Sequence, residues 1–338
     1  MYPPMTQPTP PRLDVIAIGN AIIDVIANCP DALIDDLGLS RGGMMLIDAD
    51  QARDLYAAMG PAREISGGSA ANTLAGLAAL GAKCGFVGQV ADDQLGEVFT
   101  HDIRAAGIAF DVAARAGDPP TARCLIFVTP DGQRTMNTFL GASHYLPAEA
   151  LDDAMIADAA VLYLEGYLWD PEEPRAAMRK AIAAARAAGR KIAFTPSECF
   201  VIERHRADFL SLIEGGEIDV LFCNEPELAA LTSEADFEAG LAALRPKVPV
   251  LVVTRGADGA VALSGDKRAE VAAQPVDKVV DTTGAGDLFA AGFLYGHVRG
   301  KSLDDALRMG AICASEIISH YGARPECDLA AFVAQRMA

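Results

Sequence analysis

LDVIAIG, residues 13–19, is a short apolar run that ends at a glycine, and the fold class follows from it. Because the run is apolar at consecutive positions, it predicts a strand buried on both faces, as in a parallel sheet. Similar runs recur at residues 84–90, 161–164, 191–194, 219–223 and 250–254. Alanine-rich segments with helical periodicity alternate with them or follow them, at residues 70–80, 95–106, 172–188, 200–214, 225–231, 285–299 and 303–319. This alternation predicts an α/β fold whose parallel sheet is covered by helices on both faces.

Two segments interrupt the alternation. Residues 44–47 and 121–140 have strand-like patterns without long helices between them. Within the second segment, the turn Pro130-Asp131-Gly132 separates two strand-like runs, which indicates a hairpin. We therefore predict a small β-lid inserted into the main body. The predicted organisation is a flexible tail at 1–12, a main α/β domain at 13–19, 49–109 and 141–338, and the lid at 20–48 and 110–140.

The charge balance excludes several classes of partner. The chain has 28 Lys and Arg against 46 Asp and Glu, a net charge of −18 that repels nucleic acids and anionic membrane surfaces. No apolar stretch reaches the roughly 18 residues of a membrane span, and the proline-rich N-terminus lacks the apolar segment of a signal peptide. The seven cysteines are scattered and never form a C-x-x-C pair, as is typical of reduced thiols. We expect a cytoplasmic protein, and the sequence leaves both a monomer and a homodimer open.

The strongest local motif is Asp281-Thr-Thr-Gly-Ala-Gly-Asp287, directly before a predicted helix. Glycines at the start of a helix let backbone N–H groups converge on an anion, and the helix dipole adds attraction. An anion hole formed by Gly284, Ala285 and Gly286, with the carboxylate of Asp287 beside it as a base, suits phosphoryl transfer to a hydroxyl group. The alternative is a glycine turn capped by an aspartate.

Two other motifs place polar groups next to predicted elements. Gly67-Gly68-Ser-Ala-Ala-Asn72-Thr opens the helix predicted at 70–80, and its glycines permit a ligand to approach the backbone closely. Gly19-Asn20-Ala-Ile-Ile-Asp24 directly follows the first strand. An aspartate in an otherwise apolar run is costly to bury unless it binds a partner, for example vicinal sugar hydroxyls. A tight turn for the first motif and a hydrogen-bonded turn aspartate for the second are the alternatives.

In this order and this far apart, GGSAANT and DTTGAGD resemble the two signatures of the ribokinase-like (PfkB) carbohydrate kinases. Asn224-Glu-Pro-Glu227 resembles the N-x-x-E motif of that family, and Thr254-Arg-Gly256 resembles its nucleotide-contacting T-x-G motif. The resemblance extends from residue 13 to the C-terminus and implies a three-layer α/β/α sandwich with a small β-lid. The N-terminal GNAIIDVIA and the lid hairpin are most similar to adenosine kinases. That similarity implies ATP-dependent phosphorylation of the 5′-hydroxyl of a purine nucleoside, with adenosine converted to AMP in purine salvage.

The resemblance also implies an acceptor site. The residues that would hold the ribose are Asn20, Asp24, Gly67, Gly68 and Asn72. The residues that would form apolar and aromatic walls around the base are Met44, Leu46, Met136, Leu140 and Tyr167. Methionines and leucines that alternate on strands also fill ordinary cores, so core packing is the alternative for these walls. Arg134 would belong to the same site or would be a solvated lid residue.

The resemblance further implies a nucleotide and its cations. The residues that would contact ATP are Asn224, Glu227, Thr254, Gly256, Ala314, Ser315 and Ile318. Glu227 would hold Mg²⁺ through water, since that ion keeps several waters and takes other ligands from the phosphates. Asp281 and Thr283 match a K⁺ site that many relatives have. The five histidines show no spacing for a zinc site.

Two alternatives to a nucleoside kinase follow from the same residues. The first is a sugar or sugar-acid kinase of the ribokinase, fructokinase or 2-keto-3-deoxygluconate kinase type. An anionic acceptor would favour several cations near the lid, where Arg123 and Arg134 are the candidates, and this favours a neutral acceptor. The second is a non-catalytic protein that senses nucleosides, against which Asp287, Asn224 and Glu227 argue because they are intact.

Overall fold

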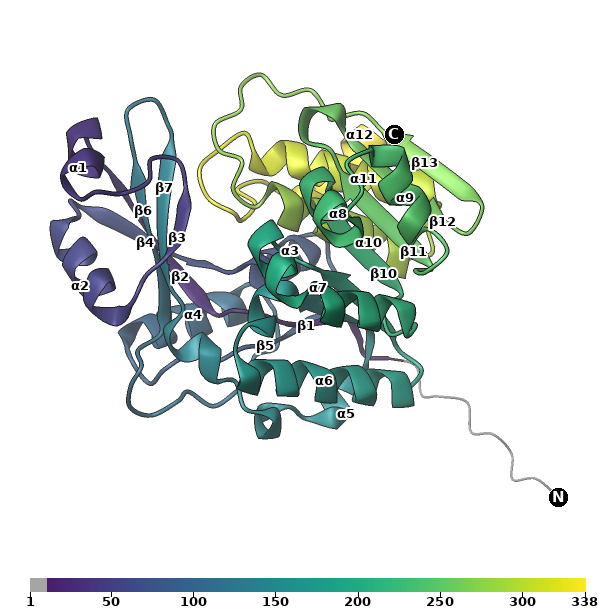
Figure 1. Ribbon diagram of the computed structural model, residues 1–338, viewed down its shortest axis with the longest axis horizontal. Coiled ribbons are helices and arrows are strands. Elements are labelled where there is room, and N and C mark those ends of the chain that lie inside the picture. The colour runs from purple at the N-terminus through teal and green to yellow at the C-terminus, as the bar shows by residue number, and fades with distance from the viewer. Residues whose placement is uncertain (1–10) are drawn as a thin grey trace.

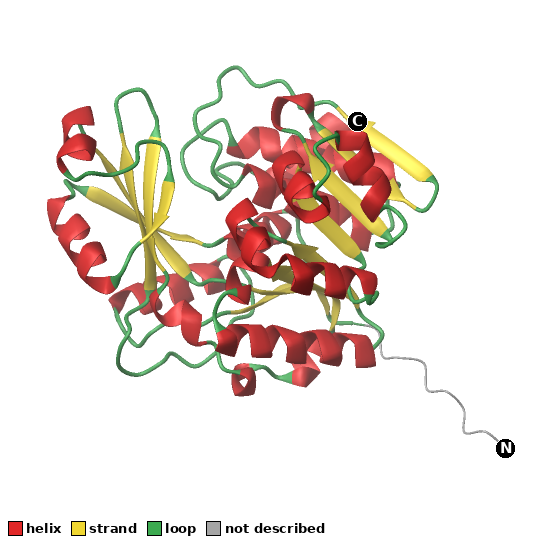
Figure 2. Cartoon of the chain, in the orientation of Figure 1, coloured by secondary structure: helices red, strands yellow, loops and turns green. Residues whose placement is uncertain are grey.

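The computed structural model describes residues 11–338, so the tail predicted at 1–12 lies almost entirely outside the described residues. The described chain forms two lobes (Figure 1). The larger lobe holds an eight-stranded sheet, and the smaller lobe, at the left of the view, holds a five-stranded sheet. Helices cover both faces of the larger sheet, whereas the smaller sheet carries helices on its outer side (Figure 2). Among the described helices, none has the length and apolarity to cross a lipid bilayer.

The larger sheet has the order β13-β12-β11-β10-β9-β8-β1-β5. The pairs from β11 to β5 are parallel, and the β12–β13 hairpin adds an antiparallel edge. Every apolar run predicted as a buried strand lies in this sheet. Its strands are β1 (Leu13–Ile18), β5 (Cys84–Val87), β8 (Ala159–Glu165), β9 (Lys191–Thr195), β10 (Val220–Asn224), β11 (Val250–Thr254), β12 (Ala260–Ser264) and β13 (Lys267–Val271).

Two apolar cores lie on opposite faces of this sheet. Along β1, Val15 and Ala17 belong to one core, while Ile16 and Ile18 belong to the other, as the period of two in a strand requires. The first core packs under α3 (Ser69–Ala79), α4 (Gln94–Ala105), α10 (Ala285–Val298), α11 (Leu303–Ile317) and α12 (Leu329–Met337). The second packs under α5 (Asp153–Ala157), α6 (Glu172–Ala187), α7 (Cys199–Glu214), α8 (Glu225–Thr232) and α9 (Phe237–Leu244). The predicted α/β/α sandwich is confirmed.

The smaller sheet, the lid, has the order β3-β7-β6-β2-β4. One face, with Ile23, Val25 and Phe127, joins the core under its helices, and the other face carries a separate apolar cluster that includes Ile22 and Ile126. Burial of the first face fixes the register of the lid strands although each is short, because a slip by one residue would turn that face outward. The elements of the lid are β2 (Ile22–Asn28), α1 (Asp31–Asp36), β3 (Met44–Leu46), α2 (Ala49–Ala58), β4 (Ala62–Gly67), β6 (Ala122–Val128) and β7 (Arg134–Phe139).

The boundary of the lid differs from the prediction. The segment 49–109 was assigned wholly to the main domain, but β4 pairs antiparallel with β2 along its whole length, and α2 packs on β6 and β7. The lid therefore extends to Gly67. The segment Ala-Arg-Glu-Ile-Ser-Gly at 62–67 has no apolar run because β4 is an edge strand with exposed, charged residues, so the pattern of a buried strand is missing there.

Candidate active site

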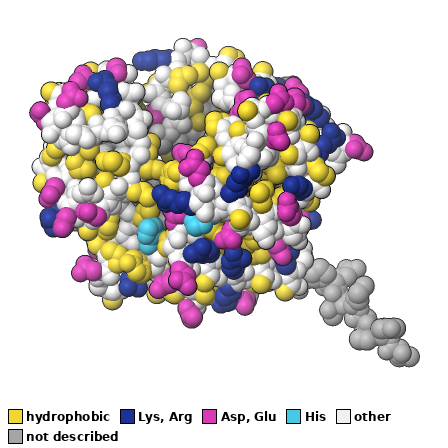
Figure 3. Space-filling view, viewed as in Figure 1, with side chains coloured by type: hydrophobic (Ala, Val, Ile, Leu, Met, Phe, Trp, Pro, Cys, Tyr) yellow, Lys and Arg dark blue, Asp and Glu magenta, His cyan; other side chains and the backbone are white. Residues whose placement is uncertain are grey.

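A cavity of about 650 Å³ lies between the two lobes. The main body contributes the carboxyl ends of β8, β9, β10 and β11 and the first residues of α3 and α10, and the lid contributes β2, β3, β6 and β7. Figure 3 shows the hollow between the lobes, with apolar side chains on its wall. In open parallel sheets, the carboxyl edge of the strands is where ligands bind. The topology therefore places the predicted motifs on one cavity.

The predicted anion hole is the N-terminus of α10. Gly284 precedes the helix with φ 77°, a conformation that favours glycine, and a Cβ atom there would lie 2.8 Å from that of Ala323. A Cβ at Gly286 would meet open space, so the first turn of the helix faces the cavity without a side chain in front of it. The backbone N–H groups of Ala285 and Gly286 and the helix dipole together suit a phosphate oxygen at this point.

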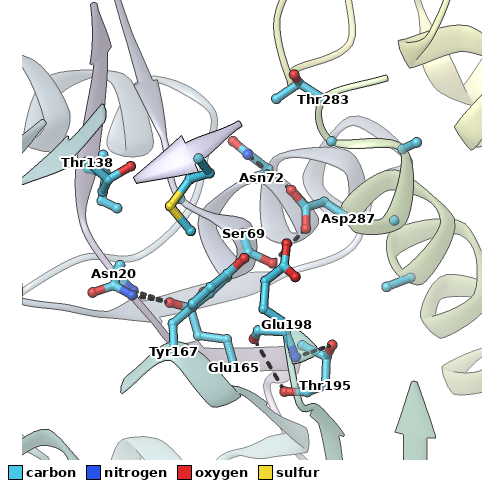
Figure 4. Close-up of a pocket in the computed structure, with 18 of the residues that line it drawn as sticks. Asn20, Ser69, Asn72, Thr138, Glu165, Tyr167, Thr195, Glu198, Thr283 and Asp287 are labelled. Carbon is cyan, nitrogen blue, oxygen red and sulfur yellow. Dashed lines mark hydrogen bonds between the residues drawn. The ribbon is translucent and has the colours of Figure 1, made fainter. Parts of the chain in front are cut away.

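The carboxyl group of Asp287 lies beside that anion hole. Its Oδ1 accepts a hydrogen bond from Ser69 Oγ at 2.6 Å, and its Oδ2 accepts one from Asn72 Nδ2 at 3.2 Å (Figure 4). Burial raises the pKa of Asp287 to about 6, while the two hydrogen bonds favour the ionised form. A carboxylate with this pKa is ionised at neutral pH and can still take a proton from a hydroxyl group. The geometry fits the predicted base.

The glycines at 67 and 68 make room for polar groups of the lid junction. A Cβ atom at Gly67 would lie 2.5 Å from Oδ2 of Asp24, and one at Gly68 would lie 2.2 Å from the carbonyl oxygen of Asn20. Gly68 also has φ 96° as the residue before α3. A side chain at either position would displace Asp24 or the backbone of Asn20. The close approach explains the glycine pair.

Two buried acceptors in the same wall have no partner within the described structure. Oδ1 of Asn20 and Oδ1 of Asn72 are shielded from solvent and accept no hydrogen bond there. A buried polar atom without a partner is costly, and hydroxyl groups of a ligand would satisfy both. Burial also raises the pKa of Asp24 to about 7, although the guanidinium groups of Arg134 and Arg324 lower it. This end of the cavity is built to receive hydroxyl groups.

Glu165, at the end of β8, is a residue that the sequence motifs did not indicate. Its side chain is fully buried and accepts hydrogen bonds from the backbone N–H and Nδ2 of Asn20, at 2.7 and 2.8 Å, and from the N–H of Ala70 at 2.8 Å. Burial raises its pKa to about 7. Glu165 thus connects the start of the lid to the first turn of α3 (Figure 4) and positions Asn20.

We expect Glu165→Gln to lower the melting temperature by several degrees, because the amide would turn an N–H₂ group toward one of these donors. An unsatisfied buried donor costs about 1–3 kcal/mol, which corresponds to a shift of about 2–10 °C in a domain of this size. Differential scanning calorimetry measures the shift. Glu64→Gln on the exposed edge of β4 is the matched control and should change the melting temperature by less than about 1 °C. Equal melting temperatures for both variants would contradict the role of Glu165.

The lid face forms an apolar wall next to Asp24. All four predicted wall residues of the lid line the cavity, together with lid residues that the motifs did not indicate. Tyr167, from the short 3-10 helix Gly166–Trp169, lies across the cavity from the lid, and its ring centroid is 6.4 Å from that of Phe200. The wall residues of the lid are Ile22, Met44, Leu46, Cys124, Ile126, Met136 and Leu140. A flat apolar ligand portion fits between these two sides.

A second cavity of about 470 Å³ lies on the other side of the anion hole. The two cavities share Thr254, Thr282, Ala285, Gly286 and Phe289 in their linings. The predicted nucleotide residues that line the second cavity are Thr254, Gly256, Ala314, Ser315 and Ile318. The N-terminus of α10 is therefore placed between two ligand-sized cavities, which is the arrangement that group transfer between two substrates requires.

Asn224 and Glu227 bind each other at the start of α8. The N–H and Nδ2 of Asn224 donate to Glu227 at 3.0 and 2.8 Å, and the N–H of Glu227 donates to Asn224 Oδ1 at 2.8 Å. Burial raises the pKa of Glu227 to about 7. Both residues line the main cavity, as does Glu198, which the motifs did not indicate. No group of three His, Cys, Asp or Glu side chains able to hold a metal occurs in residues 11–338. Mg²⁺ in general keeps several waters and binds substrate phosphates, so contact with Glu227 through water stays a prediction.

Arg134 and Asp281 form a buried ion pair. Arg134 Nη2 lies 2.6 Å from Asp281 Oδ2, and the two side chains are 8% and 3% exposed. Arg134 Nη1 also donates to Thr283 Oγ1 at 3.3 Å. The alternative of a solvated lid residue is therefore wrong for Arg134. The guanidinium also lies at the carboxylate to which the resemblance assigned K⁺.

Comparison with known protein families agrees with the geometry of this site. The model of the pfkB family carbohydrate kinases matches residues 13–329, so the chain belongs to this family. It is a phosphotransferase of the sugar or nucleoside kinase type, and the family implies the use of ATP and Mg²⁺.

Similar proteins include both nucleoside kinases and sugar kinases by name. An adenosine kinase from Sinorhizobium meliloti is 47% identical, with a TM-score of 0.91 and coverage of 96% of this chain and 99% of that one. A probable sugar kinase from Rhizobium etli CFN 42 is 45% identical, with a TM-score of 0.92 and the same coverage. A 5-dehydro-2-deoxygluconokinase from Shouchella clausii is 32% identical over 263 residues, which cover 75% of this chain and 81% of the relative.

Proposed function

We propose that this protein is an ATP-dependent kinase that phosphorylates the 5′-hydroxyl of a purine nucleoside, with adenosine as the acceptor and AMP as the product. The observation that carries the proposal is the apolar lid face directly beside Asp24. A free sugar carries a hydroxyl group on nearly every carbon and gains little from such a wall, whereas a purine base has two large apolar faces. The similarity to the adenosine kinase from Sinorhizobium meliloti supports the same acceptor.

The polar end of the cavity would orient the ribose. Asp24 would accept from the 2′- and 3′-hydroxyls, and the unpartnered Oδ1 atoms of Asn20 and Asn72 would accept from hydroxyls as well. This orientation would direct the 5′-hydroxyl toward Asp287 and the anion hole, which line the same cavity. Asp287 would take the hydroxyl proton as the oxygen attacks the γ-phosphate, and the N-terminus of α10 would stabilise the charge on the transferred group. Mg²⁺ bound to the phosphates would neutralise part of their charge.

The raised pKa values predict a dependence of activity on pH. Asp287 and Asp24 have pKa values of about 6 and about 7 in the ligand-free protein, and both act as carboxylates in this proposal. Protonation therefore removes activity as the pH falls, and kcat/KM for adenosine should decrease below pH 7 with a slope that approaches 2 below pH 6. A steady-state profile from pH 5 to 8.5 tests this. A flat profile down to pH 5.5 would contradict the assignment of both groups.

An acidic sugar is the second candidate acceptor, and two observations favour it. Relatives of similar sequence include the 5-dehydro-2-deoxygluconokinase from Shouchella clausii and an ATP-dependent ribose-1-phosphate kinase from Halopiger xanaduensis, 30% identical over 283 residues. The structure also holds a buried cation, Arg324, whose charge lowers the pKa of Asp24, although Arg324 does not line the cavity. Burial lowers the pKa of Arg324, whose Nε and Nη2 are buried without hydrogen-bond partners in the described structure. An anionic acceptor would satisfy such a group.

A thermal-shift panel distinguishes the two candidates. A ligand that binds only the folded state raises the melting temperature, by several degrees at about 100 times its Kd. We expect adenosine to stabilise the protein in the presence of a non-hydrolysable ATP analogue. Ribose, fructose and 5-dehydro-2-deoxygluconate should have smaller effects. The matched control is Asp24→Ala, which should lose the response to adenosine and keep the response to the analogue. A larger shift from a sugar acid than from every nucleoside would favour the second candidate.

A further inference from the structure

The side chain of Arg134 joins the lid to the loop that precedes the anion hole. Arg134 is the first residue of β7, directly after the turn of the lid hairpin, and its guanidinium pairs with Asp281 of the loop before α10. The guanidinium also lies 5.5 Å from the ring centroid of Tyr321, in the loop between α11 and α12. Figure 1 shows these loops of the main body extending toward the lid hairpin. Three segments far apart in the sequence therefore meet at Asp281.

Both oxygens of Asp281 are already in use. Oδ1 accepts from the backbone N–H and from Oγ1 of Thr283, at 3.0 and 2.8 Å. Oδ2 accepts from the N–H of Gly322 at 3.0 Å and is paired with Arg134 at 2.6 Å. Thr283 Oγ1, the other predicted K⁺ ligand, also faces Arg134 at 3.3 Å. The residues assigned to K⁺ by resemblance are therefore satisfied by protein groups.

A monovalent metal ion at Asp281 would compete with this guanidinium. Two unit charges 4 Å apart repel by about 4 kcal/mol at the effective dielectric of a protein surface, and by more in a buried site. The pair is buried on both sides, so Asp281 needs one positive partner, and it has one. K⁺ and Arg134 are alternatives at this carboxylate.

We propose that Arg134 is the resident counter-cation of Asp281, in place of a bound monovalent metal ion, and that it positions the anion-hole loop from the lid. The positive charge that stabilises the loop before α10 is then carried by the lid hairpin. The arrangement predicts an enzyme that is indifferent to K⁺ in its wild-type form. Removing the guanidinium should create a requirement for a monovalent cation. Arg134 acts through Asp281 and is a positioning residue in this account.

The test compares melting temperatures in KCl, NaCl and choline chloride at one ionic strength and without substrates. For the wild type, the three values should agree within about 1 °C. Arg134→Gln leaves a buried carboxylate unpaired and should lower the melting temperature in choline chloride by at least about 5 °C. K⁺ should then restore at least about 3 °C, and more than Na⁺ does. Arg53→Gln, on the exposed face of α2, is the matched control and should show neither effect.

Two more variants keep the test decisive. Arg134→Lys retains a positive charge and should be insensitive to K⁺. The double variant Arg134→Gln with Asp281→Asn removes both charges, so it should be more stable than Arg134→Gln alone. Its melting temperature should not depend on K⁺, as in Arg134→Lys. If Arg134→Gln does not fold, the wild type and these two variants still decide the question.

Enzymatic activity provides a second readout. This readout rests on the proposed function, whereas the melting temperatures are measured without substrates and do not depend on it. ADP release by Arg134→Gln should fall at least ~10-fold in Na⁺ and recover in part in K⁺. Selective stabilisation of the wild type by K⁺ over Na⁺ would overturn the proposal. An Arg134→Gln variant without a loss of stability, or with a loss that K⁺ does not restore, would overturn it as well.

Discussion

Replacing Asp287 with asparagine is expected to lower kcat by ~10²–10⁴-fold, because the amide keeps the shape of the side chain but cannot accept the proton. Oδ1 still accepts from Ser69 in the variant, so the first turn of α10 should stay in place. The affinity for ATP should therefore change little, since the second cavity and the backbone of the anion hole are untouched. Steady-state ADP release, with nucleotide binding measured by calorimetry, separates the two quantities.

The control for this substitution is Asp266→Asn, in the exposed turn between β12 and β13. That variant should retain wild-type kcat within about twofold. An Asp287→Asn variant that retains near wild-type turnover would show that another group takes the proton. Loss of both nucleotide binding and thermal stability would instead show that Asp287 mainly supports the structure of the loop.

Replacing Asp24 with alanine should lower kcat/KM for adenosine by at least ~10²-fold. Two hydrogen bonds to a charged group, each worth about 1.5–3 kcal/mol, would be lost together. Asp24→Asn should lie between the alanine variant and the wild type, because an amide oxygen still accepts. Asp54→Ala, on the exposed face of α2, is the control for general effects of the lid.

The same residue should discriminate between ribose and 2′-deoxyribose. We expect 2′-deoxyadenosine to be the poorer substrate by at least about 1.5 kcal/mol, or tenfold in kcat/KM, because the carboxylate is then left with one partner. In Asp24→Ala this ratio should shrink toward 1, since the group that contacts the 2′-hydroxyl is absent. An unchanged ratio in the variant would assign recognition of the 2′-hydroxyl to another residue.

Much of the fold could be predicted from the sequence because its strongest signals are those of buried parallel strands. The apolar runs at 13–19 and 250–254 are strands β1 and β11, and the hairpin at 121–140 is β6 and β7. Edge strands lack that signal. Strand β4, at the edge of the lid sheet, has exposed, charged residues along half its length, so the pattern does not assign the segment up to Gly67 to the lid.

The candidate site was predictable where its chemistry lies in contiguous motifs. Gly284, Asn72 and Asp287 belong to two such motifs, and the structure brings them to one cavity. Glu165 and Arg324 could not be predicted, because each is a single charged residue outside any motif. Their partners lie more than 90 residues away in the sequence, as Ala70 does for Glu165. The pairing of Arg134 with Asp281 escaped for the same reason. Only the folded chain shows that the lid residue lies on the loop rather than in solvent.

The identity of the acceptor decides the proposed function, and a comparison of kcat/KM among acceptors measures it. The panel consists of adenosine, guanosine, ribose, fructose, 5-dehydro-2-deoxygluconate and ribose 1-phosphate, each with saturating ATP and Mg²⁺, with the product identified by mass spectrometry. We expect kcat/KM for adenosine to exceed that for every free sugar and sugar acid by at least ~10²-fold, since a purine base covers the apolar wall of the lid. The product should be AMP. Turnover of a sugar or sugar acid above that of every nucleoside would contradict the proposed function.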